Sequence, residues 1–194
     1  NEQTSFSPAS PYGAAKLYAH WITKVYQEAY DMFAVSGILF NHESPIRGLE
    51  FVTRKITNAA VQIKLGLKKD ISVGNLESKR DWGYAPEYME AIYLMMQQDK
   101  PETYVISTNE AHSVEELAKL SFEVLNLDWK DYVKTDKKYH RPLDINLLKG
   151  DYSKAKNELG WEPKTKFHEL IKLMVNEDLK RWEMFLDGKV FPWD

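Results

Sequence analysis

Near its start the chain reads Ser10-Pro11-Tyr12-Gly13-Ala14-Ala15-Lys16, and this heptapeptide predicts a long helix over residues 11–30. Ser10 is a good helix cap, Pro11 suits a first turn, and apolar residues follow at helical spacing. Tyr12 and Lys16 share one face of this helix because they are four residues apart. An ammonium beside a phenol favours the phenolate, so the pair suits a general acid and base that also binds a ribose hydroxyl. The spacing alone is weak evidence, since most such pairs are ordinary surface residues.

Helix and strand patterns alternate along the rest of the chain, which predicts an α/β fold. The apolar run 32–40 is expected to be a buried parallel strand, and 41–50 the loop beyond its carboxyl end. A methionine-rich stripe between residues 86 and 98 is interpreted as core, and 126–150 as an irregular surface excursion. The remaining expected elements are helices at 51–65, 86–98, 114–125, 153–159 and 166–186, and strands at 71–73 and 104–107.

The composition is that of a globular protein without disulfide or thiol chemistry. Hydrophobic residues make up 43 % of the chain, the formal net charge is −3, and cysteine is absent. An acidic balance gives no reason to expect nucleic acid or an anionic membrane as a partner, and no apolar run approaches the length of a membrane span. We therefore expect a cytoplasmic protein. The histidines are scattered without a His-x-x-x-His pair, so no metal site is expected.

Several segments match one family in the same order along the chain. The motifs are 10–16 with Tyr18-Ala19-His20-Trp21, then 37–45, 51–56, 74–83, 141–142 and 150–156. Together they resemble the GDP-mannose 4,6-dehydratase family of the extended short-chain dehydrogenase/reductases. The resemblance implies the C-terminal portion of such a protein, with the end of a Rossmann-type sheet and a mixed α/β substrate-binding domain. Residues 1–45 would be the remnant of the NADP-binding Rossmann domain, and 46–194 the nucleotide-sugar domain, with some segments packing back on the Rossmann sheet.

We expect the chain to be part of a longer protein. Its first methionine is Met32, and its nine glycines are nowhere clustered as a dinucleotide-binding turn requires. The resemblance implies that this turn and the family's catalytic Thr and Glu precede residue 1. The chain alone is therefore expected not to turn over.

The resemblance also implies which residues form the site. Tyr12 and Lys16 would be catalytic, and with His42 and Arg47 they would contact the cofactor. The implied substrate-binding residues are Asn41, Val52, Lys55, Gly74, Asn75, Arg80, Arg141 and Asp144. Without the family, the cations at the start of helix 51–65 suit a bound diphosphate and a solvated surface equally well. The chain departs from the usual pattern at Ile46, Tyr84 and Pro86, where the family has Arg, His and Lys.

The activity implied is conversion of GDP-mannose to GDP-4-keto-6-deoxymannose and water with tightly held NADP. The alternatives are a related GDP-sugar reductase or epimerase and, from a different class, a non-catalytic nucleotide-sugar-binding domain. The resemblance further implies a homodimer or homotetramer paired through the helix of Tyr12 and Lys16. Aromatic residues on more than one face of that helix, Tyr18 and Trp21 among them, support a second partner.

Overall fold

Helices alternate with short strands along the chain, and the strands pair into small sheets that are mostly parallel. The computed structural model describes residues 1–139 and 145–189. Arg141 and Asp144, both predicted to bind substrate, lie outside the described residues. The α/β class expected from the sequence is confirmed.

Helix α1, Pro11–Tyr30, has the bounds that the sequence predicted. The Ser10 hydroxyl accepts a hydrogen bond from the Gly13 amide at 3.0 Å, and the helix ends at Asp31 in the left-handed region. Strand β1, Ser36–Leu39, follows and pairs in parallel with β6, Thr103–Ile106. The strand expected over 32–40 is therefore parallel but shorter. The prediction that it is buried is wrong, because none of the residues of β1 is buried and Met32 and Phe33 before it are 48 % and 40 % exposed.

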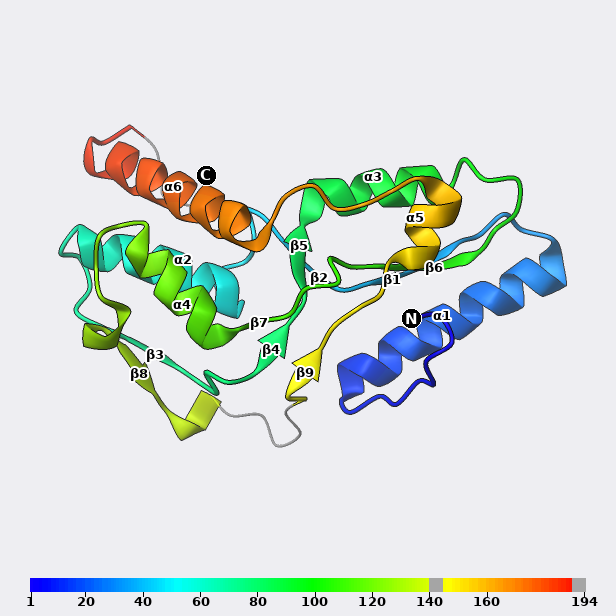
Figure 1. Cartoon of the computed structure of the whole chain (residues 1–194), viewed down its shortest axis with the longest axis horizontal. Helices are drawn as coiled ribbons and strands as arrows, with labels where there is room; N and C mark the ends of the chain where they lie inside the picture. The colour runs from blue at the N-terminus through cyan, green and yellow to red at the C-terminus, as the bar shows by residue number, and fades with distance from the viewer. Residues whose placement is uncertain (140–144, 190–194) are drawn as a thin grey trace.

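Strand β2, Asn41–Glu43, begins two residues after β1 and belongs to another sheet. It pairs in parallel with β5, Trp82–Tyr84, so the prediction of a loop from residue 41 is wrong. The partner strand lies about forty residues away along the chain, which no local pattern reveals. Because it passes from one sheet to the other, the segment β1–β2 joins the two halves of the molecule in Figure 1.

Three helices form the half on the left of Figure 1: α2, Val52–Lys64; α4, Val114–Glu123; and α6, Phe167–Leu186. Ile56, Leu117 and Ile171, one from each helix, are fully buried in their common core. Helix α4 begins with the expected capping box: Ser113 Oγ accepts from the Glu116 amide at 3.0 Å, and the Glu116 carboxylate accepts from the Ser113 amide at 2.8 Å.

A second core lies on the other side of β2, where α3, Ala85–Met95, and α5, Ser153–Leu159, pack against β6. Helix α5 ends at Gly160 in the left-handed conformation, as predicted. The buried face of α3 consists of Tyr88, Ala91 and Met95. Met89 and Met96 are 49 % and 45 % exposed, so the interpretation of the methionine stripe as core is wrong for these two residues. Strand β6, which pairs with β1, and the helices packed on it all come after residue 46 in the chain. The domain boundary at residue 45 stays a prediction.

The stretch expected to be irregular contains short elements that pair with earlier strands. Strand β8, Val133–Thr135, pairs in parallel with β3, Ile71–Val73. Strand β4, Lys79–Arg80, lies between β7, His112–Ser113, and β9, Leu147–Leu148. The short helices η1, Trp129–Asp131, and η2, Lys137–Tyr139, flank β8. None of the helices in the described part of the chain combines the length and apolar character needed to cross a bilayer.

Candidate functional site

Two cavities lie on opposite faces of β2. Successive side chains of a strand point to opposite faces, so Asn41 and Glu43 line one cavity and His42 lines the other. We call them the α2 pocket, with a volume of about 460 Å³, and the α1 pocket, with a volume of about 600 Å³. This strand is therefore the structural boundary between two candidate ligand sites.

The α2 pocket gathers the predicted substrate-binding residues from four separate parts of the chain: β2, the start of α2, the loop after β3, and β4. Arg47 and Tyr139 line it as well. All of the predicted substrate residues that the structure describes are present in its wall: Asn41, Val52, Lys55, Gly74, Asn75 and Arg80.

One side of the α2 pocket is closed by Tyr139. The Lys55 Nζ lies 3.8 Å from the centroid of the Tyr139 ring and donates a hydrogen bond to the Ser72 carbonyl oxygen at 2.7 Å. A Cβ on Gly74 would come within 2.7 Å of the Tyr139 carbonyl oxygen, so only glycine permits this approach. Sequence reasoning missed Tyr139, whose one signal was its position just before the Arg141-Pro142 motif.

Arg54 and Lys55, neighbours in the first turn of α2, have different surroundings. Arg54 is buried: its Nε donates to Asp178 Oδ1 at 2.8 Å, and Nη2 lies 2.6 Å from the same oxygen. Thr57 also donates to Asp178, at 2.7 Å. Burial raises the pKa of Asp178, while Arg54 and Thr57 oppose that rise. Neither explanation considered from the sequence, a bound diphosphate or a solvated surface, fits Arg54; only Lys55 fits a ligand.

Glu43 is an acidic group in the wall of the α2 pocket and is only 2 % exposed. Thr53 donates to its carboxylate at 2.6 Å, and the Arg47 Nε lies 3.3 Å away without hydrogen-bond geometry. Burial raises the pKa of Glu43, and the contacts with Thr53 and Arg47 oppose the rise. The Arg47 guanidinium also stacks 3.6 Å from the centroid of Phe51.

Two predicted site residues need separate comment. Arg47, predicted to contact the cofactor, lines the α2 pocket and not the α1 pocket that holds the other predicted cofactor residues. Arg80 donates through Nη1 to the Ile145 carbonyl oxygen at 2.6 Å and to that of Lys79 at 2.9 Å. These bonds fix the Arg80 side chain at the edge of the α2 pocket.

The α1 pocket brings together Tyr12, Lys16 and His42. The Tyr12 side chain is 72 % exposed, and the Lys16 Nζ lies 5.6 Å from the centroid of its ring. The His42 Nδ1 is 2.9 Å from the Phe40 carbonyl oxygen, and its ring packs 5.3 Å from that of Tyr88. The buried His20 also lines this pocket and was not identified as a site residue from the sequence.

The chemistry available differs between the pockets. Cationic and amide side chains around the α2 pocket, Lys55, Arg80 and Asn75 among them, suit a diphosphate with attached hydroxyl groups. An accessible phenol beside an ammonium suits proton transfer and ribose binding in the α1 pocket. Among residues 1–139 and 145–189, no cluster of three or more His, Cys, Asp or Glu side chains has the arrangement of a metal site.

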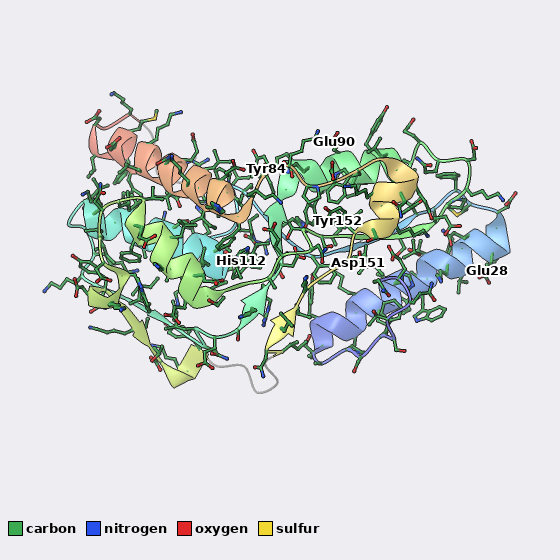
Figure 2. The ribbon with its side chains drawn as sticks, in the orientation of Figure 1. Glu28, Tyr84, Glu90, His112, Asp151 and Tyr152 are labelled. Atoms are coloured by element: carbon green, nitrogen blue, oxygen red, sulfur yellow. The ribbon has the colours of Figure 1, made fainter. Side chains whose placement is uncertain are left out.

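Strand β2, which separates the two pockets, pairs with β5. In Figure 2, Tyr84 marks the point where β5 ends and α3 begins, and Glu28 lies toward the C-terminal end of α1. The residues of α1 that line the α1 pocket lie between Tyr12 and Thr23 and include Lys16.

The fold is that of the extended short-chain dehydrogenase/reductases, as the sequence predicted. RMD from Pseudomonas aeruginosa, complexed with NADPH, has the same fold with a TM-score of 0.81 at 17 % identity, over 91 % of this chain and 58 % of that chain. The dTDP-glucose 4,6-dehydratase of Bacillus anthracis, in complex with NAD, gives a TM-score of 0.79 at 24 % identity, over 91 % of this chain and 54 % of that one.

The chain belongs to the GDP-mannose 4,6 dehydratase family, whose model matches residues 1–174. GDP-mannose 4,6 dehydratase 2 of Arabidopsis thaliana is 54 % identical over 191 residues, which are 97 % of this chain and 51 % of that protein. The Homo sapiens GDP-mannose 4,6 dehydratase is 48 % identical over 196 residues, 92 % of this chain and 53 % of that protein. The resemblance seen in the sequence is confirmed, and the chain spans about half the length of the curated relatives it matches.

Proposed function

We propose that this chain supplies the nucleotide-sugar pocket and the tyrosine–lysine pair of a GDP-mannose 4,6-dehydratase. The observation that carries the proposal is the arrangement around β2. Residues expected to bind the sugar nucleotide line one face, and Tyr12, Lys16 and His42 line the other. An enzyme that transfers hydrogen between a sugar and a cofactor needs two such sites side by side.

The α2 pocket is proposed to bind GDP-mannose. Lys55 and Arg80 supply charge for the diphosphate, and the side-chain amide of Asn41 supplies a donor on β2. The closing Tyr139 ring offers a flat apolar wall beside Lys55. Identity of about one half to GDP-mannose dehydratases supports GDP-mannose as the substrate over other sugar nucleotides.

The α1 pocket is proposed to hold the nicotinamide end of NADP. The residues present fit that group, because an exposed phenol and an ammonium face a cavity of about 600 Å³. The chemistry that NADP supplies when bound is reversible hydride transfer. Arg47, also predicted to contact the cofactor, lines the α2 pocket instead.

In the proposed reaction the mannose end of GDP-mannose extends from the α2 pocket to Tyr12, which takes the proton from the hydroxyl on the fourth carbon of the sugar as that carbon is oxidised. Lys16 holds the ribose beside Tyr12, with its Nζ 5.6 Å from the centroid of the Tyr12 ring. The keto group then acidifies the fifth carbon, from which a base removes a proton while water leaves the sixth. Loss of water leaves a double bond between the fifth and sixth carbons. The hydride removed from the fourth carbon is then added at the sixth carbon and a proton at the fifth, which gives the 4-keto-6-deoxy sugar. This chain is proposed to supply the proton transfer at the fourth carbon.

A chimaera tests the proposal. Residues 1–194 replace the matching half of Arabidopsis thaliana GDP-mannose 4,6 dehydratase 2, and the products formed from GDP-mannose are analysed by mass spectrometry and NMR. We expect GDP-4-keto-6-deoxymannose. Tyr12→Phe should lower kcat by about a hundredfold to ten-thousandfold, the usual contribution of a positioned acid–base group, with KM for GDP-mannose little changed.

Two results would point to other functions. An epimerised or reduced GDP-sugar as the main product would indicate the epimerase or reductase of the same fold. A folded chimaera that binds GDP-mannose without converting it would indicate a non-catalytic binding domain.

A further inference from the structure

His20 is the one buried side chain of α1, a helix whose other faces carry exposed aromatic residues. It stands four residues after Lys16 and eight after Tyr12, so all three share one helix face. All three also line the α1 pocket. The face of α1 that carries the tyrosine–lysine pair is thus the face on which His20 is buried.

The His20 ring is held from outside its own helix. Its Nδ1 is 2.6 Å from the hydroxyl oxygen of Ser36, the first residue of β1. The ring of Phe6, from the segment before α1, packs on it with centroids 4.9 Å apart. The contact between His20 and Ser36 therefore ties this face of α1 to β1.

The contact with Ser36 leaves the second ring nitrogen available. The His20 Nε2 has no hydrogen-bond partner in residues 1–139 or 145–189, and it is not among the fully buried atoms without a partner. A hydroxyl both donates and accepts, so Ser36 can hold Nδ1 in either neutral tautomer. The ring keeps its place whichever nitrogen carries the proton.

The electrostatic surroundings favour the neutral ring. Burial lowers the pKa of His20, and the nearby Lys24 lowers it further. The titratable groups that line the same cavity are Tyr12, Lys16 and His42, and no carboxylate is among its lining residues. With His20 neutral, Lys16 is the cation of α1 among the residues that line this cavity with Tyr12.

We propose that His20 is a positioning residue for Tyr12 and Lys16. Through Ser36 it fixes their helix face against β1, and as a neutral imidazole it adds no second positive charge beside Lys16. This inference rests on the proposed function, because it concerns the pair that would act there. It assigns a role to a residue that stands in the family motif, but to which neither the resemblance nor the spacing of Tyr12 and Lys16 gave a function.

Four variants of the 194-residue chain test the role. His20→Phe keeps a ring of similar size but removes the bond to Ser36, and His20→Asn keeps an amide in reach of that hydroxyl. Ser36→Ala removes the same bond from the other side without changing α1. His168→Phe, at an exposed position of α6, is the matched control.

The first readout is NMR of the chain without ligand. We expect the Tyr12 ring and the Lys16 side-chain signals to move in His20→Phe and Ser36→Ala, to return toward wild type in His20→Asn, and to stay fixed in His168→Phe. Side-chain nitrogen spectra should show a neutral His20 at pH 7. Unmoved Tyr12 and Lys16 signals in both His20→Phe and Ser36→Ala, or a protonated His20 at pH 7, would overturn the inference.

The second readout is binding of reduced nicotinamide mononucleotide, followed by its fluorescence. Loss of one positioned hydrogen bond should weaken binding about tenfold in His20→Phe and leave His168→Phe unchanged. If the wild-type chain fails to bind this probe, the proposed use of the α1 pocket is wrong, and the NMR comparison still decides the positioning role. Wild-type affinity in His20→Phe would count against that role while leaving the proposed function intact.

Discussion

Replacing each of the two neighbouring cations at the start of α2 by methionine should have different effects: Arg54→Met should lower the stability of the fold, and Lys55→Met should lower the affinity for GDP. Arg54→Met removes a side chain that is 4 % exposed and leaves Asp178, which is fully buried, with Thr57 as its remaining donor. Breaking a buried ion pair from one side costs about 3–5 kcal/mol. Three contacts of Arg54 are lost: two with Asp178, at 2.8 and 2.6 Å, and one with the Arg47 carbonyl oxygen at 2.9 Å.

Lys55→Met should cost little stability, because its ammonium makes one hydrogen bond, to Ser72, and lines an open pocket. We expect about 1 kcal/mol of destabilisation. Affinity for GDP should fall by about tenfold to a hundredfold, since a charged hydrogen bond to a phosphate is worth about 1.5–3 kcal/mol.

Urea unfolding and GDP titration of both variants decide between these effects. The double variant with Arg54→Met and Asp178→Leu serves as the control and should recover most of the lost stability, because no unpaired buried charge is left. A loss below 1 kcal/mol in Arg54→Met would refute the reasoning about the buried pair. Equal GDP affinity in Lys55→Met and wild type would remove Lys55 from the ligand site.

Three further predictions concern the pocket wall, the pH response and assembly. Gly74→Ala should weaken GDP binding more than tenfold in calorimetry, because its Cβ would meet the Tyr139 carbonyl oxygen at 2.7 Å; unchanged affinity would mean that this wall is not part of the site. Since burial raises the pKa of Glu43, the folded state binds that proton more tightly than the unfolded state. Wild type should therefore gain stability relative to Glu43→Gln as the pH falls from the raised pKa of Glu43 in the folded state toward the ordinary pKa of a glutamate. The free energy of unfolding in urea is measured against pH for both proteins, and parallel curves would contradict this. Replacing the exposed Tyr18 and Trp21 by glutamate in the chimaera should turn a dimer into a monomer in light scattering, and an unchanged mass would place the interface elsewhere.

Local signals predicted the helices well. Ser10, the box of Ser113 with Glu116, and Gly160 each act within a few residues, and each has its predicted structure. Their effect is visible in the sequence because a cap needs only its own turn.

Strand pairing was the part that the sequence did not reveal. Asn41–Glu43 is too short to show a pattern, and it is a strand because Trp82–Tyr84 lies beside it. The same holds for Val133–Thr135, which pairs with Ile71–Val73. Such contacts depend on tertiary structure, and single-chain periodicity does not contain them.

The candidate site shows the same division. Family motifs named Lys55 and Gly74, which the structure brings into one pocket, but they gave no separate meaning to Arg54 beside them. Its partner Asp178 lies 124 residues away along the chain, so the buried pair could not be inferred from the first turn of α2. The sequence did not identify His20 as a site residue for a similar reason, because its partner Ser36 lies on another element, β1.

Calorimetric titration of the 194-residue chain with GDP and with NADP tests the central claim most directly. All the described residues predicted to bind the sugar nucleotide line the α2 pocket. Of the residues predicted to bind the cofactor, Tyr12, Lys16 and His42 line the α1 pocket, where the nicotinamide end is proposed to bind. We predict that GDP and GDP-mannose bind more tightly than NADP or free mannose, with one site per chain. NADP binding more tightly than GDP, or no binding of GDP at millimolar concentration, would contradict the assignment of the α2 pocket.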